Sequence, residues 1–473
     1  MRPKIGLLLF TAQWFADIGA TGGSFATLPR LLDEDAAAIV TALSESLDVV
    51  CPGVLATRVQ VAEAMATFER EGVDGVVVCQ ITWGEDWLVL EALDRAPELG
   101  RSMPLLVWAY FPERRLPEPM SMVDLLRHSG PVGTLQASGP LKRSGRTFCF
   151  AFGSHRSAAT VRQLAAFGRA AHTARVLRRA VIGVLPYRCD QMSGTWVDEA
   201  RLRTGLGPRL RHFGVDEYRA ICDAVATEEV EAFVRELRAQ YRVAPNVTAA
   251  GLRAAARVSL GLAELAARYE LDAVAVEDVG PALHRAVGLR PCLAVPALFE
   301  RAVVSMEADA GASVGLLILK ELSGGTPMYT EIFAVDEAEN TLLLGHAGMH
   351  DAPHLVASPD EILIEPDGEY VESEPDSAWM RFRARGGRVT LLNVFSDADR
   401  FRFTVATGLA LDGPVRLLGS PHAVVRLDEA LPPFFERAMR SGVTQHWALV
   451  HADVVDALGY LAEMLGLGWG APE

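Results

Sequence analysis

The N-terminal third of the chain alternates short apolar runs with longer amphipathic segments. The runs at 4–10 (K-I-G-L-L-L-F), 72–81 and 103–110 contain few polar residues, which predicts strands buried on both faces of a parallel sheet. Helical spacing of apolar residues lies between them, at 31–47 and 61–71. Strands that alternate with helices predict right-handed βαβ units and an open, doubly wound sheet.

A second alternation of strands and helices follows a basic helix near 156–179. Apolar runs at 179–187, 271–279 and 290–298 predict strands, and amphipathic segments between the first two predict helices. The central part of the chain is therefore expected to form a second, smaller α/β domain.

The pattern changes again near residue 325, where the apolar segments become short and are separated by turn residues. The predicted strands lie within M-Y-T-E-I-F-A-V, T-L-L-L-G-H-A-G, E-I-L-I-E, G-R-V-T-L-L-N-V-F, F-R-F-T-V-A-T-G and V-R-L-L-G-S, and a helix at 452–465 closes the chain. This spacing predicts an antiparallel sheet or barrel. The expected fold is α/β, with two doubly wound α/β domains (1–172 and 173–318) followed by a mostly antiparallel, barrel-like β domain (319–473).

Composition narrows the partners and the compartment. Half of the 473 residues are hydrophobic and the formal net charge is −15, which disfavours nucleic acid because phosphate binding needs a concentrated basic face. No apolar run approaches the roughly 18 residues needed to span a bilayer, so no membrane partner is expected. The six cysteines are scattered without a C-x-x-C pair, which indicates reduced thiols in a cytoplasmic protein.

Four polar residues stand in apolar surroundings and suggest a site. Glu307, Glu331, His346 and His446 lie in segments that otherwise resemble buried ones, and two carboxylates with two imidazoles could hold a divalent cation. Each has an ordinary alternative when taken alone: a helix-dipole partner for Glu307, a solvent-facing strand residue for Glu331, and a core histidine for His346. Asp309, two residues after Glu307, is expected to point elsewhere.

The spacing alone does not choose among the histidines, because His350, His354 and His451 lie near the same segments. The choice comes from a resemblance. M-E-A-D-A-G-A, T-E-I-F, G-H-A-G-M-H-D-A-P and Q-H-W-A-L resemble, in this order, the metal-site segments of the L-arabinose isomerase and L-fucose isomerase family, with the arabinose branch closer at His346.

The resemblance implies a fold, a metal and an activity. It implies that Glu307, Glu331, His346 and His446 bind a divalent cation, Mn²⁺ first, with Mg²⁺ and Co²⁺ as alternatives. It also implies a homo-oligomer with shared active sites, a small sugar substrate, and aldose–ketose isomerisation through an enediol. Glu307 and Glu331 would serve as its acid/base pair, because a carboxylate on each side of the reacting carbons can relay the proton, and the metal would polarise the sugar carbonyl.

The sugar-contacting segments depart from the family pattern. The N-terminal S-Q-H-L-Y-G-like loop is T-A-Q-W-F-A here, which keeps only Gln13, and the H-T-Q segment is replaced by V-W-A-Y-F-P-E. Met192, in C-D-Q-M, matches a methionine near the sugar, although methionine also serves as core filler. Gln13 and Met192 are therefore the candidate substrate contacts, and the substrate is expected to differ from L-arabinose. The alternatives are a sugar-binding homologue without turnover and an epimerase of sugars or polyols on the same fold.

Overall fold

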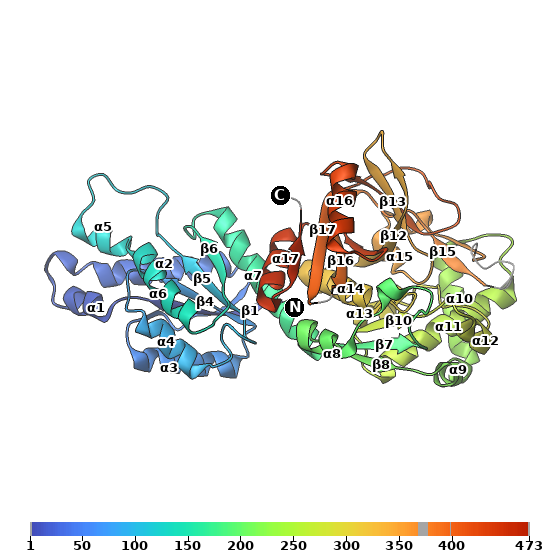
Figure 1. Ribbon diagram of the computed structural model, residues 1–473, viewed down its shortest axis with the longest axis horizontal. Helices are drawn as coiled ribbons and strands as arrows, with labels where there is room; N and C mark the ends of the chain where they lie inside the picture. Colours follow the sequence, from blue (N-terminus) through green and yellow to red (C-terminus); the bar gives the residue numbers. More distant parts are fainter. Residues whose placement is uncertain (1, 368–376, 398, 472–473) are drawn as a thin grey trace. The chain divides into compact units, whose positions relative to one another are not determined.

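The computed structural model describes residues 2–367, 377–397 and 399–471. They form two compact units, one of residues 1–175 with 456–466 and one of residues 176–455 with 467–473 (Figure 1). None of the helices in the described ranges is both long and apolar enough to pass through a bilayer. The boundaries between three domains stay predictions. The second unit contains both the α/β fold expected for the central domain and the β fold expected for the C-terminal domain.

The first unit is built on a parallel sheet of strand order β2-β1-β4-β5-β6, in which β3 also pairs with β1. Three of these strands, β1, β4 and β5, coincide with the predicted apolar runs. Segment 48–55 forms two short strands, β2 and β3, because Pro52 between them has no N–H to donate and Gly53 has a φ of 101°. The strands are β1 (Lys4–Phe10), β2 (Asp48–Val50), β3 (Val54–Leu55), β4 (Gly75–Gln80), β5 (Leu105–Ala109) and β6 (Cys149–Phe152).

Helices cover both faces of this sheet, which is therefore doubly wound. Leu8 and Phe10 of β1 pack with apolar residues of α3, α4 and α6, whereas Leu7 and Leu9 pack with α2, α7 and Tyr460 of α17. Neighbouring residues of one strand thus face opposite layers, which explains why the strand is apolar throughout. The helices are α1 (Gln13–Ala20), α2 (Leu28–Leu43), α3 (Arg58–Glu71), α4 (Trp87–Arg95), α5 (Met122–Arg127), α6 (Gly130–Arg143), α7 (Ala158–Arg179) and α17 (Val455–Leu465).

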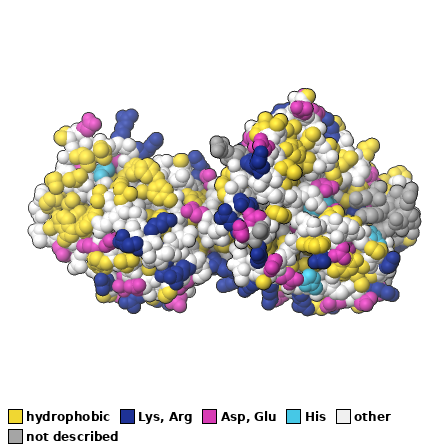
Figure 2. All heavy atoms as spheres, in the orientation of Figure 1, with side chains coloured by type: hydrophobic (Ala, Val, Ile, Leu, Met, Phe, Trp, Pro, Cys, Tyr) yellow, Lys and Arg dark blue, Asp and Glu magenta, His cyan; other side chains and the backbone are white. Residues whose placement is uncertain are grey.

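Hydrophobic side chains are also exposed on the first unit, and Figure 2 shows such side chains gathered on its visible face. Met122 and Leu125 of α5 are 59% and 50% exposed, and Val132 and Leu135 of α6 are 59% and 75% exposed. We call these four residues the α5–α6 patch. Large apolar side chains that cluster on a surface are typical of interaction sites.

The second unit begins with a four-stranded parallel sheet of order β11-β10-β7-β8. The strand predicted at 290–298 is wrong: Pro296 opens helix α13 instead, as proline suits the first turn of a helix and has no N–H for a strand ladder. The fourth strand, β8, reads R-L-R-H and gave no apolar signal. The strands are β7 (Val181–Leu185), β8 (Arg209–His212), β10 (Ala273–Val276) and β11 (Val303–Met306), and the helices are α8 (Glu199–Arg201), α9 (Val215–Ala224), α10 (Thr227–Gln240), α11 (Ala249–Arg268), α12 (Pro281–Val287), α13 (Pro296–Arg301) and α14 (Ala310–Ser323).

The second unit also contains a seven-stranded, mostly antiparallel sheet, as predicted. Its strand order is β16-β19-β12-β13-β18-β17-β20, and β16 also pairs with β17, which closes six of the strands into a ring. The segment V-R-L-L-G-S is not a strand, and the chain pairs instead at the next segment, β18. The strands are β12 (Pro327–Asp336), β13 (Thr341–Gly345), β16 (Gly387–Ser396), β17 (Phe401–Ala410), β18 (His422–Leu427), β19 (His446–Val450) and β20 (Gly468–Gly470).

Helix α14 joins the two sheets of the second unit. It contacts β7, β10 and β11 of the parallel sheet and β12, β16 and β19 of the antiparallel one. Its sequence, A-G-A-S-V-G-L-L-I-L-K-E-L-S, is apolar around most of its circumference, which suits a helix buried between two layers. Gly315 permits the close approach, since a Cβ there would lie 3.3 Å from Val394 Cγ2. The N-terminus of α14 follows the carboxyl end of β11, where ligands of parallel sheets commonly bind.

Candidate metal centre

Glu307 lies in the tight turn between β11 and α14. Its φ is 59° and that of Ala308 is 52°, so two consecutive non-glycine residues adopt the left-handed conformation, at a cost of about 1–2 kcal/mol each. Hydrogen bonds hold the turn: Glu307 N donates to Asp278 Oδ1 at 3.1 Å, and Ala308 N donates to Val276 O at 3.0 Å. Strain that the surroundings maintain in this way is typical of functional sites.

A buried arginine supports the same turn. Arg290 is 2% exposed and donates through Nη1 to Asp278 Oδ2 at 2.9 Å, while its Nε donates to Asp367 Oδ2 at 2.7 Å. The two carboxylates supply the negative charge that a buried cation requires. Asp278 thus connects this buried ion pair to the backbone of Glu307.

The antiparallel strands bring His346 and His446 to the same end of the second unit. His346 directly follows β13, and His446 is the first residue of β19. Strand β12 lies between them, and its Glu331 pairs with Gly345 of β13 and with His446 of β19. Sheet register therefore places residues close together that are 100 positions apart in the sequence.

Glu307, His346 and His446 form the candidate centre. Each offers one ligand atom, and these atoms all lie within 4.8 Å of one another. His446 Nε2 is 2.9 Å from Glu307 Oε2, and His346 Nε2 is 3.5 Å from Glu307 Oε1. Both Nε2 atoms and Glu307 Oε2 are buried, yet none has hydrogen-bond geometry to another described residue. Buried polar atoms that converge without hydrogen bonds fit a metal ion.

The other nitrogen of each imidazole is held by an acceptor. His346 Nδ1 donates to Ala347 O at 2.7 Å, and His446 Nδ1 donates to Asp309 Oδ2 at 2.8 Å. A proton fixed on Nδ1 leaves the Nε2 lone pair directed at the centre. Metal-binding histidines are commonly oriented by a carbonyl or a carboxylate in this manner, so the donor set fits a divalent cation.

In the metal-free centre, the buried acids and imidazoles shift one another's pKa values. Burial acts to raise the pKa of Glu307, but the adjacent His346 and His446 outweigh it and hold that pKa well below the usual range. Burial likewise acts to lower the pKa of His446, but Asp309 and Glu307 raise it to about 9. Without a metal, His446 therefore carries the positive charge that balances Glu307.

Two residues of the centre were not predicted. The expectation that Asp309 points elsewhere is wrong: it is buried, contacts His446, and also accepts a hydrogen bond from Ala312 N at the start of α14. Tyr329 is buried with its ring 4.5 Å from that of His346 and 4.8 Å from that of His446, and its hydroxyl donates to Met306 O. The sequence offered a signal only for Asp309, namely a second acid within M-E-A-D.

The other predicted residues lie at different distances from the centre. Glu331 is the cross-strand neighbour of His446, outside the group of three ligand atoms, and its role as ligand and base stays a prediction. Met192 Sδ accepts a hydrogen bond from Gln445 Nε2 at 3.0 Å, so it lies beside the residue that precedes His446. Gln13 is an exposed residue at the start of α1 in the first unit, and its contact with a substrate also stays a prediction.

The competing histidines have other partners. His350 Nε2 donates to His346 O at 2.8 Å, and burial lowers the pKa of His350 to about 4. His354 pairs with Asp351, and His451 Nε2 lies 2.8 Å from Arg385 O. None of these three histidines belongs to the group formed by Glu307, His346 and His446.

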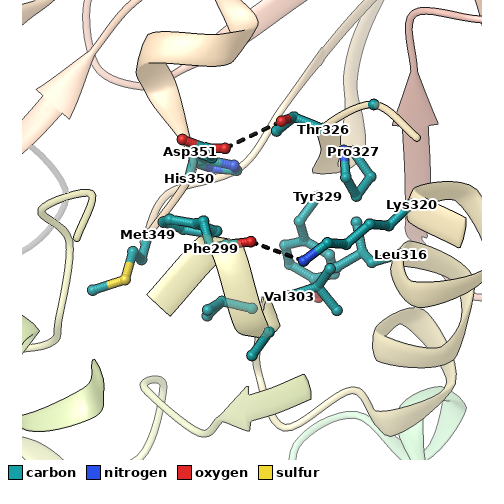
Figure 3. A pocket seen from close by; sticks show the side chains of 13 residues that line it. Phe299, Val303, Leu316, Lys320, Thr326, Pro327, Tyr329, Met349, His350 and Asp351 are labelled. Carbon is teal, nitrogen blue, oxygen red and sulfur yellow. Dashed lines mark hydrogen bonds between the residues drawn. The ribbon is translucent and has the colours of Figure 1, made fainter. Parts of the chain in front are cut away.

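Tyr329 also lines a small pocket, shown in Figure 3. Its volume is about 30 Å³, enough for a water molecule or two and too little for a sugar. Its polar groups have partners within the protein: Lys320 Nζ donates to Phe299 O at 2.8 Å, and Thr326 Oγ1 donates to Asp351 Oδ2 at 3.1 Å. This space is therefore a small gap in the packing beside strand β12, which contains Tyr329.

Comparison with known proteins supports the resemblance to the L-arabinose isomerases that the metal-site segments suggested. No protein-family model matches the chain. A sulfoquinovose isomerase from Alkalicoccus urumqiensis is 25% identical over 400 residues, which cover 83% of this chain and 85% of the relative. One from Priestia aryabhattai is 25% identical over 89% of this chain and 90% of its own. An L-arabinose isomerase from Shouchella clausii (strain KSM-K16) is 25% identical over 57% of this chain and 56% of its own.

The chain is similar to arabinose-isomerase-like proteins over most of its length. The relatives that align with it are sulfoquinovose isomerases and L-arabinose isomerases. The sulfoquinovose isomerases align over a larger share of the chain. The resemblance inferred from the metal-site segments is thereby confirmed for the arabinose branch, and the link to fucose isomerases stays a prediction.

Proposed function

We propose that this protein is a metal-dependent aldose–ketose isomerase that acts on a small sugar. The observation that carries the proposal is the convergence of Glu307, His346 and His446, whose facing atoms are buried and lack hydrogen bonds. The relatives support the reaction type, because those reported are named isomerases of a sugar. Their names differ in the sugar, so the reaction type has more support than the substrate.

The three residues would hold the cation, with Glu331 as a fourth ligand from the neighbouring strand. Carboxylate and imidazole ligands suit Mn²⁺, and also Mg²⁺ or Co²⁺. When bound, the cation would polarise the sugar carbonyl and stabilise the negative charge that develops on its oxygen.

Glu331 and Glu307 would form the acid/base pair. A carboxylate removes the proton from the carbon beside the carbonyl and returns a proton to the former carbonyl carbon, while a hydroxyl proton moves from the second oxygen to the first. The overall change is an isomerisation with no net oxidation. Asp309 would hold the imidazole of His446 in the orientation that the centre needs.

The test is turnover of an aldose panel by the metal-loaded protein in D₂O, with ketose detection. We expect ketose formation with deuterium on the former carbonyl carbon, because an acid/base group exchanges its proton with solvent. Glu331→Gln should lower kcat by about 10²–10⁴-fold. Glu337→Gln is the matched control, since Glu337 is an exposed residue in the turn after the same strand.

Two outcomes would contradict the proposal. Bound metal with no ketose from any aldose would favour a sugar-binding protein without turnover. Full activity of the Glu331→Gln variant would remove the proposed acid/base pair.

A further inference from the structure

A buried cluster of one arginine and two aspartates lies behind the turn that carries Glu307. Arg290 is 2% exposed, and Asp278 and Asp367 are each 1% exposed. Arg290 pairs with Asp367 through two hydrogen bonds, at 2.7 and 2.9 Å, and with Asp278 through one, at 2.9 Å. Such a cluster is a weak source of stability, because desolvation is costly and apolar residues in its place often serve as well. Its presence therefore points to a role other than stability.

Asp278 uses its two oxygens for two different partners. Its Oδ2 accepts a hydrogen bond from Arg290 Nη1, and its Oδ1 accepts one from the backbone N–H of Glu307 at 3.1 Å. Strand β10 pairs in parallel with β11, with Val276 opposite Met306, so this contact joins the carboxyl ends of two neighbouring strands. Because Arg290 holds the carboxylate from the other side, Oδ1 stays directed at the turn.

The turn itself needs such support. Glu307 and Ala308 have φ values of 59° and 52°, in the left-handed region that residues with a Cβ disfavour. Two hydrogen bonds hold them there, from Ala308 N to Val276 O at 3.0 Å and from Glu307 N to Asp278. The first uses a backbone carbonyl that any residue supplies, whereas the second depends on one side chain. Asp278 is thus the part of this support that the sequence specifies.

Arg290 also borders a second part of the centre. Its guanidinium carbon lies 5.9 Å from the centre of the Trp379 ring, within reach of a cation–π contact. The buried Trp379 belongs to the same apolar cluster as Ala347, and Ala347 O accepts the Nδ1 proton of His346 at 2.7 Å. The arginine therefore lies beside the segment that orients this imidazole as well as beside the carboxylate that supports the turn.

We propose that Asp278, held in place by Arg290, positions Glu307 for the metal and so sets the metal affinity of the centre. Asp278 contacts the backbone of a ligand, so it is a positioning residue and not a ligand. Each ligand would then have its own positioning acceptor: Ala347 O for His346, Asp309 for His446 and Asp278 for Glu307. The inference rests on the proposed function, since it takes Glu307 as a metal ligand.

The test compares Asp278→Asn with Asp367→Asn by isothermal titration with Mn²⁺. Each change removes one carboxylate charge beside Arg290 at nearly constant volume, and Asp367→Asn should lose at least as much thermal stability, because Asp367 makes two of the three bonds to the arginine. The hydrogen bond to Glu307 N belongs to Asp278. Asp278→Asn should therefore raise the Kd for Mn²⁺ by about 10- to 100-fold, whereas Asp367→Asn should leave it unchanged. Equal losses of affinity in both variants, or no loss in Asp278→Asn, would overturn the inference.

A second-site change separates positioning from a general loss of structure. Ala308→Gly removes the Cβ that disfavours the left-handed conformation. In the Asp278→Asn background it should restore Mn²⁺ affinity by up to about tenfold, and in the Asp367→Asn background it should not. A failure to restore affinity would contradict the role given to Asp278. If Asp278→Asn does not fold, Asp278→Glu and Asp367→Glu keep the charges of the cluster and displace each carboxylate by one methylene. A lower affinity in Asp278→Glu alone would then support the inference, and equal affinities would overturn it.

Hydrogen exchange of the metal-free protein makes the two proposals distinguishable. Asp278 Oδ1 holds the amide hydrogen of Glu307, so peptides that span 303–309 should exchange faster in Asp278→Asn and at the wild-type rate in Asp367→Asn. If the wild type binds no Mn²⁺, the proposed function fails, yet faster exchange at this turn in Asp278→Asn alone would still support the positioning of Glu307. If the wild type binds Mn²⁺ and the turn exchanges alike in all three proteins, the proposed function stands and the inference falls.

Discussion

Asp309 shows what one buried carboxylate adds to the candidate centre. It accepts the Nδ1 proton of His446 at 2.8 Å and also caps α14 through Ala312 N. Resemblance identified Glu307 and His446, but no sequence pattern connected Asp309 with a histidine 137 positions away. The contact depends on β19 lying beside α14, and it becomes visible only in the folded chain.

The first prediction concerns this contact. Asp309→Asn removes the negative charge that orients His446, so metal affinity should fall by about 10- to 100-fold. Asp94→Asn, at an exposed position on α4, is the control. Isothermal titration with Mn²⁺ measures both, and an unchanged affinity in Asp309→Asn would contradict the role given to this residue.

The second prediction is a pH dependence of the metal-free protein. The pKa of His446 is raised to about 9 because Asp309 and Glu307 outweigh the effect of burial, whereas an unfolded histidine has a pKa near 6.5. A raised folded pKa stabilises the protein fully below about pH 6.5, and this stabilisation is lost as the pH rises through about 9. Urea unfolding in the presence of a chelator should show a loss of up to about 3 kcal/mol between pH 6.5 and 10. His446→Gln should flatten this slope, and an equal slope in both proteins would contradict the assignment.

At the scale of elements, long apolar runs were predicted well and weakly apolar ones were not. The buried strands β1, β4 and β5 follow directly from runs such as K-I-G-L-L-L-F, because both faces of a parallel sheet are covered. Strand β8, R-L-R-H, was missed because its side chains are largely exposed. The run at 290–298 was misassigned because apolar character alone does not distinguish a buried loop or helix from a strand.

Helix α14 carries the third prediction, because it spaces the two sheets that bear the candidate ligands. A Cβ at Gly315 would already lie 3.3 Å from Val394 Cγ2 and 3.6 Å from Ala448 Cβ. Gly315→Leu should therefore lower the free energy of unfolding by about 1–3 kcal/mol and weaken Mn²⁺ binding by displacing the turn at Glu307. Ala239→Leu, exposed on α10, is the control. Chemical denaturation and titration measure the two effects, and a variant with wild-type stability and affinity would contradict this account of the packing.

At the scale of the whole molecule, the resemblance implies a homo-oligomer, and the α5–α6 patch is the surface that we expect to be covered. Leu135 and Met122 expose 75% and 59% of their surfaces, and removal of such side chains from water stabilises association. Met122→Gln with Leu135→Gln should shift the sedimentation coefficient toward that of a monomer. Replacement of the exposed Val59 and Met439 by Gln, outside the patch, is the control. A wild type that sediments as a monomer at every concentration, or an unaffected variant, would contradict this prediction.

The most direct test of the central claim is the pulsed electron paramagnetic resonance of Mn²⁺ bound to the purified protein. If Glu307, His346 and His446 hold the ion, one Mn²⁺ binds per chain and its spectrum shows couplings to imidazole nitrogen, which weaken in His346→Gln and vanish in His346→Gln with His446→Gln. Absence of tight Mn²⁺ binding would contradict the account. So would nitrogen couplings that persist in the double variant.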